Sequence, residues 1–380
     1  MSTSAPAARL LRLDVRDFRN LEHVELAPPR EGFALIGENG QGKTNLLEAI
    51  YYLQILRSVR GARDQDLVRF GQGAFHLGAT VETGAQHEVG VGFERAGKRK
   101  RVRVDGVIPE RLSDALGALP SVMFSPADVE LVAGSPNARR RYLDIMLALT
   151  TGGYLNALQR YRAALVRRNA ALRAAARATR DAVAEVAVWE PALAEFGAAI
   201  WRARNDWTDA VARQFEVLCA EIGESSQVRL RYSSAPALVD DPVGVLMRAL
   251  EERRGHDLKR GLTSVGPHRD DLTITLDGRE LRAFGSAGQQ RTAAIALRML
   301  ETATFTERTG KTPVFLLDDP FAELDLRRAS RILAMLVDAE REAGAQQIIL
   351  AVPRAAEIPR ELTSLARLSI AGGELSWMDA

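Results

Sequence analysis

The chain has 380 residues, of which 46% are hydrophobic and 26% are charged, and its formal net charge is only +2. This composition is typical of a globular protein large enough for one big domain or two lobes, and the total charge is no evidence for a nucleic-acid partner. The single cysteine, Cys219, excludes internal disulfides and a cysteine-based zinc site. No apolar run reaches membrane-spanning length, and residues 1–13 lack a secretory apolar core, so we expect a cytoplasmic protein.

The first third of the chain predicts short strands around one helix. Apolar and charged residues alternate over 11–15, the period of a half-buried strand, and an apolar run at 33–36 leads into a glycine-rich loop. Leucine and isoleucine then recur at helical spacing over 46–53. Further strands are expected at 24–26, 77–82, 89–94 and 101–105, so a nucleotide-binding unit is combined with antiparallel strands.

The middle and the end of the chain differ in pattern. Residues 136–223 are rich in Ala, Leu and Arg and predict several long helices, one of them opened by Pro191, without the sustained heptads of a long coiled coil. Residues 223–236 and 240–242 are interpreted as connections. The final third predicts a hairpin at 272–281, helices at 289–302 and 326–339, and strands at 314–317 and 347–351.

The glycine-rich loop predicts a phosphate site, because glycines allow successive backbone N–H groups to surround an anion at the start of a helix. Lys43 would reach the β- and γ-phosphates, and Thr44 would bind magnesium. The alternative is a glycine-rich turn with an exposed lysine; the flanking strand and helix favour the nucleotide site. Its residues are Gly37, Glu38, Asn39, Gly40, Gln41, Gly42, Lys43 and Thr44.

Two further segments would complete this site. Asp318 and Asp319 end a buried strand, where Asp318 can hold magnesium and Asp319 can orient or deprotonate the attacking water. Ser286, Gly288 and Gln289 precede and begin a helix and form a second anion site, which we expect another copy of the chain to present to the nucleotide. The alternatives are a capping Asp pair and an N-cap serine with a glycine turn.

Several separated motifs together resemble the ABC ATPase head found in transporters and SMC-type repair proteins, and within that group the RecF family. The resemblance covers nearly the whole chain in order. Besides the three segments above, it depends on Phe18-Arg19-Asn20, Leu56-Arg57-Ser58, Phe124-Ser125-Pro126, Gly134-Ser135-Pro136, Arg139-Arg140-Arg141, Gly266-Pro267-His268-Arg269-Asp270-Asp271 and Glu323-Leu324-Asp325.

This resemblance implies an α/β fold: an ABC-type head, with a mixed sheet, a phosphate loop and an antiparallel β subdomain, plus a mainly helical second lobe without a long coiled coil. The resemblance implies that residues 1–120 form the N-terminal part of the ATPase lobe, residues 121–265 form the helical lobe, and residues 266–380 form the C-terminal part of the ATPase lobe. The implied function is recombinational gap repair with support of the SOS response. ATP with Mg²⁺ would drive homodimerisation on duplex DNA or single-strand/double-strand junctions, RecO and RecR would help to load RecA, and the ATPase would be weak and DNA-stimulated.

Two departures from the ABC pattern affect the expected hydrolysis. Many ABC ATPases carry Glu after the magnesium-binding Asp, whereas this chain has Asp319, whose shorter side chain predicts slow hydrolysis. No His follows the strand at 347–351, so a γ-phosphate sensor is not predicted there. The segment 124–126 is the candidate for the glutamine loop. A non-hydrolysing dimerisation scaffold and a transporter ATPase subunit are the alternative functions.

Basic clusters predict where DNA phosphates would bind without reading sequence. One candidate set comprises Arg57, Arg60, Arg63, Arg139, Arg140 and Arg141, and residues 98–103 form a further cluster. The alternative is a set of solvated surfaces in which some of these side chains pair with neighbouring acids. For His268 and Arg269 we favour a hydrogen-bonded turn over direct contact with the nucleotide.

Overall fold

The computed structural model describes residues 6–175, 181–237, 240–320, 326–343 and 346–378. The chain divides into two compact units. Unit 1 comprises Met1–Asp128 and Ile295–Ala380, and unit 2 comprises Val129–Ala294. The lobe boundaries expected at 120 and 265 remain predictions, and each unit is described by itself.

Unit 1 contains a six-stranded sheet with the order β14-β13-β3-β12-β11-β7, in which only β14 is antiparallel to its neighbour. β11 and β12 are buried at every residue, as expected for central strands of a parallel sheet. The strands span Gly32–Ile36 (β3), Ser121–Phe124 (β7), Val314–Asp318 (β11), Ile348–Val352 (β12), Ala366–Ala371 (β13) and Glu374–Trp377 (β14).

The second sheet of unit 1 is antiparallel, with the order β2-β1-β4-β5-β6. In β4 and β5 buried and exposed side chains alternate, so one face is buried and the other is solvated. The elements span Arg9–Phe18 (β1), Leu21–Leu26 (β2), Ala74–Thr83 (β4), Ala85–Glu94 (β5), Arg99–Val104 (β6) and, between β2 and β4, Asp64–Leu67 (α2).

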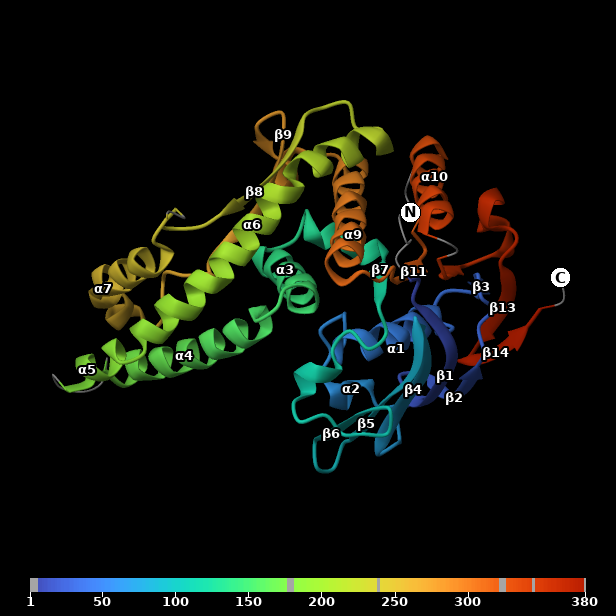
Figure 1. Ribbon diagram of the computed structural model, residues 1–380, viewed down its shortest axis with the longest axis horizontal. Helices are drawn as coiled ribbons and strands as arrows, with labels where there is room; N and C mark the ends of the chain where they lie inside the picture. The colour runs from blue at the N-terminus through green and yellow to red at the C-terminus, as the bar shows by residue number, and fades with distance from the viewer. Residues whose placement is uncertain (1–5, 176–180, 238–239, 321–325, 344–345, 379–380) are drawn as a thin grey trace. The chain divides into compact units, whose positions relative to one another are not determined.

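Helix α1 (Lys43–Ile55) contacts both sheets of unit 1 (Figure 1). Its apolar residues do not form a single stripe, and nearly every side chain from Leu46 onwards is buried, as expected for a helix packed on several sides. This central position fixes the loop before α1 at the carboxyl edge of β3. Helix α10 (Leu326–Ala343) also belongs to this unit.

Unit 2 is mainly helical, with a three-stranded sheet ordered β10-β9-β8. The long α6 packs against α4, α7 and β8. The elements span Pro136–Thr150 (α3), Tyr154–Ala175 (α4), Asp181–Ala187 (α5), Glu190–Ile222 (α6), Val228–Ser233 (β8), Pro242–Arg260 (α7), Asp271–Leu276 (β9), Arg279–Glu280 (β10) and Leu281–Phe284 (α8). Helix α9 (Ala287–Thr309) begins in unit 2, and the division between the units falls within it.

The structure confirms the predicted N-terminal strands, the helix after the glycine-rich loop, the helical middle and the hairpin at Asp277-Gly278. The prediction that 223–236 is a connection was wrong, because β8 lies there and pairs with β9. Its signal was present, since Val228 and Leu230 are buried and alternate with exposed Arg229 and Arg231. No helix of the described residues has the length and apolar character needed to cross a membrane.

Candidate nucleotide site

The glycine-rich loop links β3 to α1, and its shape requires glycine at particular positions. Gly40 and Gly42 have φ angles of 84° and 119°, which other residues rarely adopt. A Cβ on Gly37 would lie 2.4 Å from the carbonyl oxygen of Ile370, so no side chain fits there. These glycines shape a loop that ends at the start of α1. There the helix amides and the positive end of the helix dipole favour an anion.

Neighbouring segments hold the loop in place. The Asn20 side-chain amide donates to the Gln41 carbonyl oxygen at 3.0 Å and accepts from the Asn45 amide at 2.7 Å. The backbone N–H of Gly372, in the β13–β14 turn, donates to Oε1 of Gln41 at 2.6 Å. Asn20 thus links the β1–β2 turn to the loop and to α1, which gives the Phe18-Arg19-Asn20 motif a structural role.

Lys43 lies folded over its own loop. Its side chain is 7% exposed, and Nζ donates to the carbonyl oxygens of Gly37 at 2.5 Å and Glu38 at 3.0 Å. Burial lowers the pKa of Lys43, while the charges of Asp318 and Asp319 oppose that shift. A phosphate in the loop would offer this ammonium group stronger, charged acceptors than two carbonyl oxygens.

Thr44 and Asp318 are brought together from opposite ends of the sequence. Oγ1 of Thr44 donates to Oδ2 of Asp318 at 2.9 Å, and Asp318 is 6% exposed. Burial raises the pKa of Asp318, the Thr44 hydrogen bond opposes the rise, and the charge of Asp319 adds to it. A nearby cation would relieve the cost of ionising this carboxyl, and the oxygen ligands fit Mg²⁺.

The rest of an octahedral magnesium shell would have to come from water and phosphate oxygens. Within the described ranges, no group of three or more His, Cys, Asp or Glu side chains could hold a metal by itself. This fits an ion that is bound together with a nucleotide and does not require a dedicated protein cage. The pair of Thr44 and Asp318 is therefore a candidate magnesium site.

Asp319 follows directly and adopts an uncommon backbone conformation. Its φ angle is 45°, and its N–H donates to the Ala351 carbonyl oxygen at 2.9 Å. Residues other than glycine take this left-handed conformation uncommonly. The hydrogen bond to β12 holds the main chain of Asp319 in it, and such strained conformations occur most often at functional sites. Asp319 is partly exposed, which leaves it accessible to a water molecule at the edge of the sheet.

A buried carboxylate that the sequence did not reveal lies beside the loop. Glu48 on α1 is fully buried and accepts hydrogen bonds from Arg19, from Ser58 at 2.5 Å and from Arg60 at 2.6 Å. Burial alone would raise the pKa of Glu48, but the hydrogen bonds from these three residues lower it. A single carboxylate between apolar residues of the helix, in Leu46-Leu47-Glu48-Ala49-Ile50, was the available signal.

Ser286 lies just before α9 and caps it. Its N–H donates to Oε1 of Gln289 at 2.9 Å, and the Gln289 N–H donates to Oγ of Ser286 at 3.3 Å, a reciprocal capping box. The N-cap interpretation is therefore correct as local structure. It does not compete with phosphate binding, because the hydroxyl only accepts in this pair and can still donate. Residues 322–325, the segment just after Asp319, lie outside the described residues.

The predicted DNA contacts differ in availability. Arg139 is 4% exposed and its guanidinium is engaged by Asp271, and Arg60 is engaged by Glu48, so the structure does not favour either as a free phosphate contact. Arg140 donates to the Asp270 carbonyl oxygen at 2.5 Å. Arg57 and Arg141 are partly exposed, and Arg63 is exposed.

The cluster at 98–103 is more accessible. In β6 the side chains of Arg99, Arg101 and Arg103 are exposed, and Lys100 on the other face binds Asp64 and the Leu56 carbonyl oxygen. Among the described residues, none forms a hydrogen bond or ion pair with the side chains of these three arginines. This row on an edge strand is the strongest candidate surface for a polyanion.

The Gly266–Asp271 segment lies inside unit 2, where it forms a hydrogen-bonded turn. Oη of Tyr161 lies 2.6 Å from Nδ1 of His268, and Nε2 of His268 lies 3.0 Å from the Thr263 carbonyl oxygen. The carbonyl can only accept, so Nε2 carries the proton and Nδ1 accepts from the tyrosine. Burial lowers the pKa of His268 to about 4, which keeps the ring neutral.

The family model of the RecF/RecN/SMC N-terminal domain matches residues 9–357. The DNA replication and repair protein RecF of Citrifermentans bemidjiense is 35% identical over 340 residues, which cover 88% of this chain and 91% of that protein. The chain belongs to the RecF family. RecF of Anaeromyxobacter dehalogenans is 40% identical over 340 residues, covering 86% and 89% of the two chains.

Solved structures agree with this family membership. The recombination mediator protein RecF with ATP, from the RecFOR pathway, superimposes with a TM-score of 0.88 at 28% identity, over 100% of this chain and 99% of that one. An Smc head domain from Pyrococcus furiosus gives a TM-score of 0.54 at 16% identity and shares the fold. The predicted ABC-type ATPase head with a helical lobe is thus confirmed. Membership of the RecF family argues against the alternative that the chain is a transporter ATPase subunit.

Proposed function

We propose that this protein binds ATP and DNA in recombinational gap repair, with ATP driving two copies together and slow hydrolysis separating them. The observation that carries the proposal is the hydrogen bond between Thr44 and Asp318, because it places a hydroxyl and a buried carboxylate together beneath a phosphate loop. A structure of a RecF protein with ATP, similar over the full chain, supports the choice of nucleotide.

In this proposal each residue of the loop has one task. The amides from Gly37 to Thr44 surround the phosphates. The Lys43 ammonium group gives up its hydrogen bonds to the two carbonyl oxygens and binds the β- and γ-phosphates instead. Thr44 and Asp318 would hold Mg²⁺, which neutralises charge on the phosphate oxygens. Asp319 orients the attacking water, and its short side chain on a constrained main chain makes hydrolysis slow.

The second half of the site would come from another copy. Ser286 presents a hydroxyl that can still donate, at the amino end of α9, whose amides favour an anion. Gly288 lies in the first turn of α9. ATP bound to the loop of one protomer would then be contacted by Ser286, Gly288 and Gln289 of its partner, so occupancy of the site stabilises the dimer.

DNA would bind through phosphate contacts without reading base sequence. The exposed row of Arg99, Arg101 and Arg103 supplies guanidinium groups that no carboxylate in the described part of the chain engages, and Arg63 is exposed as well. Duplex DNA and single-strand/double-strand junctions are the proposed substrates. By similarity to RecF of the RecFOR pathway, RecO and RecR are the proposed partners in placing RecA on gapped DNA.

A non-hydrolysing scaffold is the second candidate, and one observation favours it. Asp319 stands where a longer Glu would reach further toward a water, and its main chain is held by β12. Such a scaffold would bind ATP and dimerise but turn over no nucleotide. Single-turnover hydrolysis with the wild-type protein and the Asp319→Asn variant distinguishes the two, because only the switch model predicts a difference.

Sedimentation with and without ATP and Mg²⁺, repeated with gapped duplex at several salt concentrations, tests the proposal as a whole. We expect a monomer without nucleotide, a dimer with ATP, and DNA affinity that falls steeply as salt rises. A monomer under every condition would contradict the dimer, and an affinity independent of salt would contradict binding through phosphates.

A further inference from the structure

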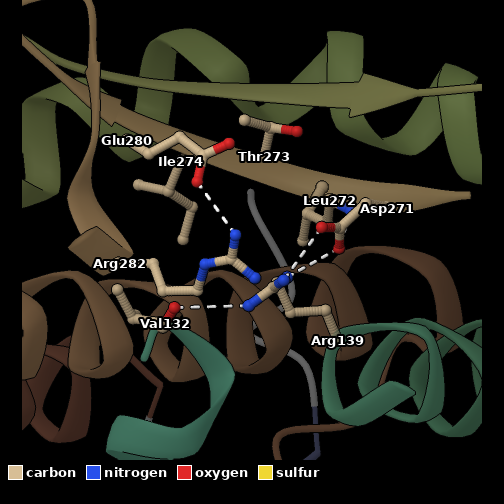
Figure 2. Close-up of a pocket in the computed structure, with 8 residues that line it drawn as sticks. All are labelled: Val132, Arg139, Asp271, Leu272, Thr273, Ile274, Glu280 and Arg282. Atoms are coloured by element: carbon tan, nitrogen blue, oxygen red, sulfur yellow. Dashed lines mark hydrogen bonds and ion pairs between the residues drawn. The ribbon is translucent and has the colours of Figure 1, made fainter. Parts of the chain in front are cut away.

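Arg139 forms a three-way connection inside unit 2. Its Nε and Nη2 donate to the two carboxylate oxygens of Asp271 at 2.7 and 2.8 Å, and Nη1 donates to the carbonyl oxygen of Val132 at 3.2 Å (Figure 2). Nη1 also donates to the carbonyl oxygen of Gly134 at 2.9 Å. The side chain is almost completely buried. Arg139 thereby joins the turn at 132–134, the first turns of α3 and the first residue of β9.

The adjacent residue makes a parallel connection. Nη1 of Arg140 donates to the Asp270 carbonyl oxygen at 2.5 Å, so two consecutive arginines of α3 hold two consecutive residues at the start of β9. Arg139-Arg140 and Asp270-Asp271 both belong to motifs of the sequence, and the candidate nucleotide chemistry uses neither pair. Their separation by more than a hundred residues hid the connection.

β9 leads to the segment of Ser286, Gly288 and Gln289, which is proposed to contact a partner's nucleotide and is called the signature below. It continues through the Asp277-Gly278 turn into β10 and α8, both of which pack on it, and α8 ends immediately before Ser286. A Cβ on Gly285 would lie 2.4 Å from Cδ1 of Leu281, so α8 and the residue after it are in close contact. Nε2 of Gln290 donates to the Leu281, Arg282 and Gly285 carbonyl oxygens, which fixes α8 against the start of α9.

We propose that the Arg139–Asp271 ion pair is the positioning device that holds β9, and through α8 the Ser286 signature, in the orientation that a partner's nucleotide requires. Arg139 is then a positioning residue for ATP-dependent dimerisation and not a DNA contact. This inference rests on the proposed function, since it assumes that Ser286 acts on the ATP of a second copy.

The geometry makes the pair sensitive to substitution. A bidentate guanidinium cannot be replaced by a lysine, which offers a point charge without the paired N–H groups. Removing the arginine would leave Asp271 without its cation and the Val132 and Gly134 carbonyl oxygens without their shared donor. A small pocket of about 20 Å³ adjoins the pair and is lined also by Ile274, Glu280 and Arg282 (Figure 2).

The test compares nucleotide binding with dimerisation in the full-length protein. In Arg139→Ala we expect ATP binding to the monomer, measured with a fluorescent ATP analogue, to stay within about twofold, because the loop belongs to unit 1. We expect ATP-dependent dimerisation, measured by sedimentation velocity, to weaken by roughly tenfold or more. Arg139→Lys should fall between the wild type and Arg139→Ala.

A matched control and a rescue separate positioning from general loss of charge. Arg282→Ala removes an arginine from the same pocket, but its ion pair with Glu280 is exposed, so dimerisation should change little. Added guanidinium ion, far below denaturing concentration, should partly restore dimerisation of Arg139→Ala and leave the wild type unchanged. A folding defect would instead lower the fraction of folded protein, which circular dichroism reports.

Each outcome bears on one statement. If both Arg139→Ala and Arg139→Lys dimerise with ATP as well as the wild-type protein does, the positioning role is wrong while the proposed function stands. If Arg282→Ala is as damaging as Arg139→Ala, the specific ion pair is not responsible. If the wild-type protein never dimerises with ATP, the proposed function itself fails.

Discussion

The loop region of unit 1 and the interior of unit 2 both concentrate charged groups, but they use them differently. Beside the loop, Lys43 donates to two carbonyl oxygens and Asp318 accepts from a hydroxyl, so each would gain from a charged ligand. In unit 2, Arg168 is fully buried and is matched by Glu190 and Asp257, which are also fully buried. A ligand has nothing to add to such a saturated cluster.

This contrast explains why arginine content alone does not predict DNA binding. Three arginines of α3 and α4 are ion-paired in the structure: Arg139 with Asp271, Arg162 with Asp144, and Arg168 with Glu190 and Asp257. The three β6 arginines are exposed, and no carboxylate of the described residues pairs with them. Charge that a fold leaves unmatched is the better indicator of a polyanion site.

Removing Lys43 should have the largest effect, because Lys43 is the one basic side chain of the loop 37–44. We expect Lys43→Ala to weaken ATP binding by about 2–5 kcal/mol or more, which abolishes it at ordinary concentrations. Asp319→Asn should instead bind ATP and accumulate as an ATP-bound dimer. Equilibrium binding and sedimentation check both, and identical behaviour of the two variants would argue against the switch.

A substitution of Glu48 tests whether unit 1, like unit 2, contains a buried charge whose hydrogen bonds are all made within the protein. Glu48→Gln removes the buried carboxylate that accepts from the partly exposed Arg19, the exposed Arg60 and the buried Ser58, so we expect a loss of about 1.5–3 kcal/mol in the free energy of unfolding. Denaturant unfolding measures this loss, and hydrogen exchange along α1 locates it. Glu82→Gln, which breaks the partly exposed pair with Arg9, should cost no more than about 1 kcal/mol. Equal losses in the two variants would contradict the special role of Glu48.

Two buried titrating groups of unit 2 should oppose each other. Burial raises the pKa of Asp270 from 3.8 to about 6, although Tyr232, Arg204 and Trp201 resist the rise, so its stabilising contribution is present at low pH and is lost as pH rises through 6. The pKa of His268 falls from 6.5 to about 4, so its contribution is present above pH 6.5 and is lost as pH falls. Each amounts to roughly 3 kcal/mol, and they largely cancel between pH 4 and 6.5.

Single substitutions should therefore reveal opposite slopes. Relative to the wild type, Asp270→Asn should lose stability as the pH is lowered from 6.5 to 4, and His268→Gln should gain stability over the same range. Unfolding free energies measured at several pH values give these difference curves. Two curves with the same sign of slope would show that at least one of these groups is not buried as described.

The β6 arginines should give the smallest effect per residue. Replacing Arg101 by Ala should weaken DNA binding equally for all sequences and reduce the slope of log K against log salt by about one. Lys100→Met removes a charge from the same strand but from the opposite face, and its slope should match that of the wild type. A slope unchanged in Arg101→Ala would move the DNA site away from β6.

Local signals predicted much of the fold and of the site. The glycines before Lys43 are required by backbone conformation within one turn, and Asp318 and Asp319 end a run of buried residues, so each segment could be recognised by itself. The hairpin at Asp277-Gly278 was likewise encoded by neighbouring residues, whose positive φ angles match the turn chemistry.

The remainder depends on partners far apart in sequence. Arg139 meets Asp271 across 132 positions and Arg168 meets Asp257 across 89, so no local pattern distinguishes these buried arginines from surface ones. Glu48 appears in sequence as one acid on a helix, and only packing on two sheets shows that it is enclosed. β7, β13 and β14 were not predicted, although β7 is buried throughout and β13 carries Ile370 against the loop.

The central claim is that each nucleotide is shared between two copies, and a mixing experiment with two defective variants tests it most directly. Lys43→Ala damages the loop and Ser286→Arg damages the signature, so neither variant alone has an intact shared site. A mixed pair has one, built from the loop of the Ser286→Arg protomer and the signature of the Lys43→Ala protomer. Sedimentation with ATP and Mg²⁺ should show dimers only in the mixture; dimers of Ser286→Arg alone, or monomers throughout the mixture, would contradict the account.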